Sequence, residues 1–160
     1  MKYVEERALK EQFWKKYGYR SNIVSYQFEC KARTGGVDLL TVEKVKDDKG
    51  FHIELCSFEF KLADIDKAFS QAYLNSQFCH KNFVVVPMDK KKVILDKYSD
   101  YFKKYPSIGC IKKYPHIGCI GVYHPEEEGG KWEMFHKCRT KADDELKQNQ
   151  EILKMCLKEL

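Results

Sequence analysis

The chain has 160 residues, 43% of them apolar, which is enough for one domain with a buried core that needs no disulfides or structural metal. It carries 29 basic and 24 acidic residues, and the resulting net charge of +5 permits a nucleic-acid partner without requiring one. The sequence has no signal-peptide core and no membrane-spanning apolar run, so we expect a single domain over residues 1–160, located in the cytoplasm and without a membrane partner.

The first half of the chain predicts one helix followed by three strands. Residues 3–17 place apolar side chains at helical spacing and end at Gly18, which is typical of an amphipathic helix. Residues 23–30 and 37–45 are rich in β-branched and aromatic or aliphatic residues and are separated by a glycine-containing loop, so we expect a hairpin. Residues 51–60 are apolar on both faces, as a strand in the middle of a sheet should be.

A crossover follows this third strand. Residues 62–78 switch to a helical period, and the run 83–86 then predicts a short buried strand that ends at Pro87. A strand, a helix and a second buried strand make a βαβ unit, so part of the sheet should be parallel. The order αβββαβ over about residues 3–87 therefore predicts an α/β core with a mixed central sheet flanked by helices.

Residues 88–160 should extend this core with a hairpin and a helix. Residues 90–105 predict a basic amphipathic helix, and residues 103–111 are repeated at once as 112–120, identical except for Ser107 and His116. The repeat is too short for a solenoid, so we interpret it as a local duplication, one copy of which continues into a strand at 117–123. After a turn at 125–130, residues 132–136 predict the second strand of the hairpin, and residues 141–160 predict the final helix.

Charged side chains occur at two strand ends that should be buried. Glu59 and Lys61 share a face at the end of the third strand, with Phe60 between them on the opposite face. Asp38 opens the neighbouring strand. Ligand sites of open α/β sheets lie at the carboxyl ends of the strands, and buried charges need a partner or a metal ion. The pair of carboxylates is typical of a Mg²⁺ or Mn²⁺ site, to which the backbone carbonyl of Phe60 would add a ligand, while Lys61 could act on a water molecule.

A known family has the same pattern. The segments Gly36-Val37-Asp38-Leu39-Leu40, Glu59-Phe60-Lys61 and Ser70-Gln71-Ala72-Tyr73 together resemble the PD-(D/E)XK, or restriction-endonuclease-like, nuclease superfamily. The resemblance covers about half of the chain and implies the αβββαβ core described above. Val37 stands where the namesake motif has a proline.

The resemblance also implies roles for individual residues. Asp38 and Glu59 would bind the metal, Lys61 would act on the attacking water, and Gln71 would lie near the site. An acid from the first helix often completes such sites, and for that position Glu5 is our first candidate.

Further candidates are less specific to the motif. Glu6 is the second candidate for the acid of the first helix. Lysine runs could follow the phosphates of a nucleic acid, and the candidates for this contact are Lys90, Lys91, Lys92, Lys112 and Lys113. The histidines and the seven cysteines do not show the close pairs that structural zinc requires, and the cysteines read as reduced thiols.

The sequence therefore predicts a Mg²⁺- or Mn²⁺-dependent DNA endonuclease or exonuclease, with RNA a weaker alternative as substrate and a homodimer possible. Other interpretations stay open. The acidic and basic residues could form a structural ion-pair network, Gln71 could cap a strand carbonyl, and the lysines could be solvated surface. The chain could also be a catalytically silent protein on a nuclease scaffold that binds nucleic acid or a protein partner.

Overall fold

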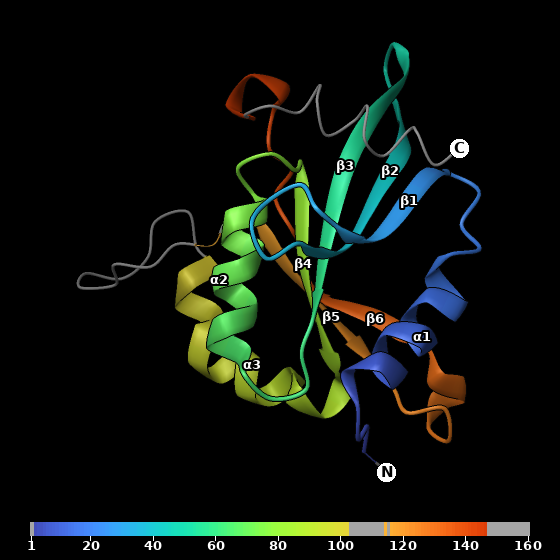
Figure 1. Cartoon of the computed structure of the whole chain (residues 1–160), viewed down its shortest axis with the longest axis vertical. Helices are drawn as coiled ribbons and strands as arrows, with labels where there is room; N and C mark the ends of the chain where they lie inside the picture. The colour runs from blue at the N-terminus through green and yellow to red at the C-terminus, as the bar shows by residue number, and fades with distance from the viewer. Residues whose placement is uncertain (1, 103–113, 115, 147–160) are drawn as a thin grey trace.

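The computed structural model describes residues 2–102, 114 and 116–146 (Figure 1). They form an α/β fold around one six-stranded sheet in the order β1-β2-β3-β4-β5-β6. The strands are β1 (Ile23–Cys30), β2 (Val37–Asp47), β3 (Gly50–Phe60), β4 (Lys81–Pro87), β5 (Ile117–Val122) and β6 (Trp132–His136). The α-helices are α1 (Glu6–Tyr17), α2 (Ile65–Asn75) and α3 (Lys91–Tyr98).

The sheet is mixed, as predicted. β1, β2 and β3 pair antiparallel, β3, β4 and β5 pair parallel, and β6 closes the far edge antiparallel to β5. The predicted βαβ unit is therefore β3-α2-β4, and β3 lies inside the sheet with a neighbour on each side. The hairpin predicted after residue 117 is β5-β6.

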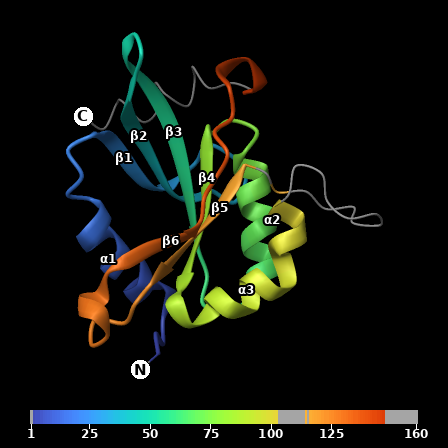
Figure 2. The same ribbon diagram turned by 180° about the vertical axis from the view of Figure 1, so that it is seen from behind.

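Helices cover both faces of the sheet, α1 on one and α2 with α3 on the other (Figures 1 and 2). Phe13 of α1 packs against Phe58 and Phe60 of β3 in one apolar cluster, whereas Phe69 of α2 packs with Val84 of β4 in another. Because successive side chains of a strand point to opposite faces, the residues between and beyond Phe58 and Phe60 face α2. The side chain of Glu59, which lies between these two phenylalanines, therefore faces α2.

The helices are shorter than the sequence pattern predicts. α1 begins at Glu6 rather than at residue 3, and α2 begins at Ile65 because Asp64 accepts a hydrogen bond from the backbone N–H of Lys67 and caps it. The predicted helix 90–105 is divided into the 3₁₀ turn η1 (Met88–Lys90), α3 and the 3₁₀ turn η2 (Ser99–Phe102). Residues 103–113, which comprise the first copy of the repeat and Lys112 and Lys113 of the second copy, lie outside the described residues.

The predicted C-terminal helix is wrong for residues 141–146. This segment contains only the 3₁₀ turn η4 (Asp143–Glu145), and the remainder of the prediction, 147–160, lies outside the described residues. Tertiary contacts override the helical pattern, because the N–H of Lys141 donates to the carbonyl of His80 (2.8 Å) and its Nζ donates to that of Ser76 (2.7 Å). Among the helices of the described residues, none is long and apolar enough to cross a membrane. A second 3₁₀ turn near the end of the chain, η3 (Glu128–Gly130), connects β5 to β6.

Candidate functional site

Asp38 and Glu59 lie directly opposite each other on adjacent strands. The antiparallel register of β2 and β3 pairs Leu39 with Phe58, which places the next residues, Asp38 and Glu59, side by side on the face toward α2. The N–H of Asp38 donates to Glu59 Oε2 (3.3 Å), and the N–H of Phe60 donates to Asp38 Oδ2 (2.9 Å). Each carboxylate is therefore held by the backbone of the other strand.

The Glu59 carboxylate is buried without full compensation. Its side chain is 1% exposed, and its Oε1 has no hydrogen-bond partner within the described residues. Burial and the adjacent charge of Asp38 raise the pKa of Glu59 to about 7. A buried carboxyl that ionises so reluctantly stores unfavourable electrostatic energy, which a bound cation would relieve.

Two residues that the sequence analysis missed contact Glu59. Nη2 of Arg33 lies 3.6 Å from Glu59 Oε2, and Asn75 Nδ2 donates to the same oxygen (2.9 Å). Arg33 Nε also donates to Asn75 Oδ1 (2.6 Å), so the three side chains are connected. A signal for Asn75 exists, because Ala68, Ala72 and Asn75 follow the helical period of the buried face of α2. Arg33 has no such signal, since it lies in the loop between β1 and β2.

Lys61 directly follows the end of β3, and its ammonium group lies toward α1, on the face of the sheet opposite to the one that Glu59 shares with α2. Its N–H donates to the carbonyl of Val85 (3.1 Å), which continues the pairing with β4, and its side chain is 16% exposed. Its Nζ lies 3.8 Å from Oε1 of Glu6, the first residue of α1. Glu5 precedes the helix, is exposed and makes no side-chain cap. Of the two acids proposed from α1, the structure thus brings Glu6 to Lys61, with Glu5 on the surface.

Gln71 lies on α2 one helical turn before Asn75, and so on the same face of the helix. Its side chain is half-buried, and its Oε1 is enclosed without a hydrogen-bond partner among the residues described. An enclosed amide oxygen is costly unless it binds a partner. Gln71 therefore adds a second oxygen without a hydrogen-bond partner, on the face of α2 that covers Glu59.

The residues present fit a cation of the Mg²⁺ type. In the described part of the chain, no three His, Cys, Asp or Glu side chains are grouped so as to hold a metal ion. Mg²⁺ needs fewer protein ligands, because one or two carboxylates suffice and water or phosphate oxygens complete its shell. Asp38 and Glu59 supply such a pair, with one oxygen of Glu59 unpaired. The carbonyl of Phe60 points to the same side of β3 as its N–H, which faces Asp38.

The lysine run after β4 is split between two short elements. Lys90 ends η1, and Lys91 and Lys92 open α3, both exposed. Cations are unfavourable at the N-terminus of a helix, where the dipole is positive. The three lysines follow the carboxyl end of β4. Because β3 and β4 are parallel, the carboxyl end of β3, which Lys61 follows, lies on the same side of the sheet. This run therefore lies toward the same edge of the sheet as the candidate site.

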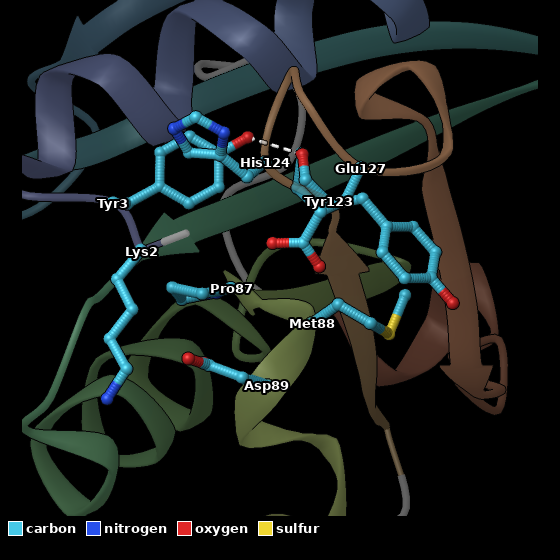
Figure 3. A pocket seen from close by; sticks show the side chains of 9 residues that line it. Lys2, Tyr3, Pro87, Met88, Asp89, Tyr123, His124 and Glu127 are labelled. Carbon is cyan, nitrogen blue, oxygen red and sulfur yellow. Dashed lines mark hydrogen bonds between the residues drawn. The ribbon is translucent and has the colours of Figure 1, made fainter.

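A separate hollow opens at the carboxyl ends of β4 and β5 (Figure 3). Tyr3 closes one side by donating its hydroxyl to the carbonyl of Tyr123 (2.6 Å). The cavity of about 30 Å³ holds about one water molecule and is far below the size of a nucleotide pocket. None of the predicted site residues lines it; its lining is Lys2, Tyr3, Pro87, Met88, Asp89, Val122, Tyr123, His124 and Glu127.

Comparisons with models of protein families, with curated proteins and with solved structures found no match to this chain. The resemblance to the PD-(D/E)XK superfamily therefore remains an interpretation of the motif residues. The function must be argued from the geometry of the site itself.

Proposed function

We propose that this protein is a Mg²⁺- or Mn²⁺-dependent nuclease that hydrolyses phosphodiester bonds in DNA, on a fold of the restriction-endonuclease-like kind. The observation that carries the proposal is the opposed pair of Asp38 and Glu59, in which Glu59 is buried, raised in pKa and left with one unpaired oxygen. A structural pair of carboxylates would be expected to have its charge compensated. A cation site leaves that compensation to the ion.

Each residue of the site would have a separate role in the reaction. Asp38 and Glu59, with the carbonyl of Phe60, would hold the ion. Once bound, the ion supplies Lewis-acid activation of water and neutralises charge on the phosphate. Lys61, directly after β3, would orient a water molecule and donate to a phosphate oxygen, and its ammonium group lies 3.8 Å from Glu6. Gln71 would position a water or substrate oxygen from α2.

The lysines of α3 support a nucleic-acid substrate. Lys91 and Lys92 are exposed at a helix N-terminus, where they gain nothing from the helix dipole and where their ammonium groups would be available to phosphate oxygens. Phosphate contacts of this kind are independent of sequence and weaken as salt rises. We propose that these lysines hold the DNA backbone beside the hydrolytic site.

The test is cleavage of labelled duplex, single-stranded and branched DNA, and of RNA, with Mg²⁺ or Mn²⁺. Lys61→Met preserves the length of the side chain and removes its charge, so we expect cleavage to fall by about 10²-fold or more while folding is retained. Lys67→Ala is the matched control, because Lys67 is exposed on α2 and its side chain lies outside the site. Metal-dependent cleavage that Lys67→Ala keeps and Lys61→Met loses supports the proposal.

A second candidate is a catalytically silent protein on the same scaffold that binds nucleic acid or a protein partner. The ion pair between Arg33 and Glu59 favours it, because a guanidinium already opposes the charge that a metal would otherwise neutralise. Wild-type protein that cleaves none of the substrates with either ion, yet remains folded, would replace the nuclease proposal with this one.

A further inference from the structure

Arg33 has a largely buried side chain in a loop whose other residues range from exposed to half-buried. Residues 31–36 connect β1 to β2, and Lys31, Thr34 and Gly35 are exposed, whereas the Arg33 side chain is only 12% exposed. Its guanidinium remains charged at any ordinary pH, so its burial needs an acceptor. It is directed inward to Asn75 and to the Glu59 carboxylate.

The contact between Arg33 and Glu59 partly neutralises their opposite charges but leaves one hydrogen-bonding atom of each side chain without a partner. The distance from Nη2 to Oε2 is 3.6 Å, longer than the 2.7–2.9 Å or so of a charge-assisted hydrogen bond. Nη2 of Arg33 and Oε1 of Glu59 are both enclosed, and neither has a hydrogen-bond partner within the described residues. A partner that ligates the carboxylate directly would therefore compete well with the guanidinium.

The turn at the end of the loop is held by contacts within the loop, and only Ala32 and Arg33 of residues 31–35 reach inward. Gly35 and Gly36 have positive φ values of 87° and 76°, a region that glycine enters at little cost. The loop's own backbone bond, from Gly36 N–H to the Arg33 carbonyl (3.0 Å), depends on nothing outside the loop. The Arg33 side chain thus joins the loop to α2 and β3.

We propose that Arg33 is an internal counter-ion for Glu59 in the metal-free protein, and that a divalent cation bound by Asp38 and Glu59 displaces it and releases the β1–β2 loop. The inference rests on the proposed metal site and adds a conformational change to it. A cation on Glu59 and the guanidinium beside it would repel each other across a poorly solvated space. By linkage, whatever holds Arg33 on Glu59 lowers the affinity for the cation, and the cation loosens Arg33 to the same extent.

The first measurement is the affinity for Mg²⁺ by isothermal titration calorimetry at pH 8.5, where Glu59 is ionised. Arg33→Gln should bind Mg²⁺ about tenfold more tightly than the wild type, because the competing charge is gone. Lys31→Gln is the matched control, since it removes one positive charge from the exposed part of the same loop, and it should change the affinity by less than about twofold. Glu59→Gln should abolish the binding.

The second measurement needs no variant. Trypsin cleaves after exposed arginines, so the rate of the cut after Arg33, followed by mass spectrometry, reports release of its side chain. Mg²⁺ should accelerate this cut about fivefold or more in the wild type and leave the cut after Lys49, in the turn between β2 and β3, unchanged.

The outcomes separate this inference from the function on which it rests. An Mg²⁺ affinity that Glu59→Gln abolishes but Arg33→Gln leaves unchanged or weakens, or an unchanged cut after Arg33, overturns the inference and leaves the metal site standing. Absence of Mg²⁺ binding to the wild type overturns both. Tighter binding by Arg33→Gln together with the faster cut supports the inference.

Discussion

Two buried glutamates on the same strand have opposite electrostatic surroundings. Glu54 and Glu59 of β3 are 3% and 1% exposed. Burial raises the pKa of Glu54, but the hydrogen bond with His52 (2.6 Å) and the ion pair with Lys81 (3.1 Å) outweigh it, and the net pKa is lowered. Burial and the charge of Asp38 raise the pKa of Glu59 to about 7, against weaker opposing contacts.

The comparison shows that burial alone does not set the state of a carboxylate. Both side chains are almost fully buried on one strand, and each has one oxygen without a hydrogen bond among the described residues. The charged partners differ: one Glu54 oxygen lies 3.1 Å from the Lys81 ammonium and its other oxygen 2.6 Å from His52, whereas the nearest cation to Glu59 is a guanidinium at 3.6 Å and Asp38 adds a negative charge beside it. Glu54 belongs to an ion-pair network that stabilises the sheet. Glu59 is the carboxylate that lacks part of its compensation, which is the property we assign to a cation site.

The largest expected effect is an opposite change in stability when each charge is removed. At pH 8.5, Glu59→Gln should raise the free energy of unfolding by about 2–3 kcal/mol, because burial of the charge and its repulsion from Asp38 outweigh the ion pair with Arg33, which keeps Asn75 Oδ1 as an acceptor. Glu54→Gln should lower it by about 1–3 kcal/mol, because Lys81 loses its partner. Urea denaturation of both variants measures the difference. If both substitutions destabilise the protein alike, the two sites do not differ as described.

The pH dependence of stability should isolate Glu59. Its pKa is about 7 in the folded protein and 4.5 when unperturbed, so the folded state binds more protons between these values. Stability from this group is therefore full below about pH 4.5 and falls by up to about 3 kcal/mol as pH rises to 7. The free energy of unfolding of the wild type minus that of Glu59→Gln, with both measured from pH 4.5 to 8.5, should show this fall. A flat difference curve would show that Glu59 is fully compensated.

Added Mg²⁺ should act on Glu59 and leave Glu54 unaffected. At ten times its dissociation constant and pH 8.5, Mg²⁺ should stabilise the wild type and Glu54→Gln by about 1.4 kcal/mol. The same addition should leave Glu59→Gln unchanged, which thermal unfolding can detect. Equal stabilisation of all three proteins would place the ion elsewhere.

The smallest expected effect is on the pKa of His52, a partly exposed side chain that contacts Glu54 at 2.6 Å. Hydrogen bonds to Glu54 and then to Asp47 raise the pKa of His52 from its ordinary value of 6.5. Its stabilising charge is fully present below pH 6.5 and is lost as pH rises through the higher folded value. An NMR titration of the ring should give a midpoint above 6.5 that falls in Glu54→Gln. A midpoint that the substitution leaves in place would assign the shift to Asp47 alone.

The strands and the opposed carboxylates were predictable because local and tertiary signals agree. The turn after Asp47 leads directly from β2 into β3, so the register that brings Asp38 opposite Glu59 follows from short-range connections. Glycines and apolar alternation mark the ends of these strands. The mixed order of the sheet then follows from the crossover helix.

The parts that sequence reasoning missed depend on distant contacts. Arg33 reaches Asn75, 42 residues away, from a loop that looks solvated in any sequence reading. Lys141 follows an amphipathic pattern but is bound in an extended segment by His80 and Ser76, contacts that no local propensity encodes. Such pairings appear only once the sheet has brought its loops together.

The most direct test of the central claim is the carboxyl titration of Glu59 by ¹³C NMR, with and without Mg²⁺. We expect a midpoint near pH 7 in the metal-free protein, and a midpoint below 4.5 when Mg²⁺ occupies the site. Assignment by comparison with Glu59→Gln removes ambiguity with Glu54. A Glu59 midpoint at or below 4.5 without metal would show that its charge is already compensated, and one that Mg²⁺ does not move would show that the ion does not bind Glu59.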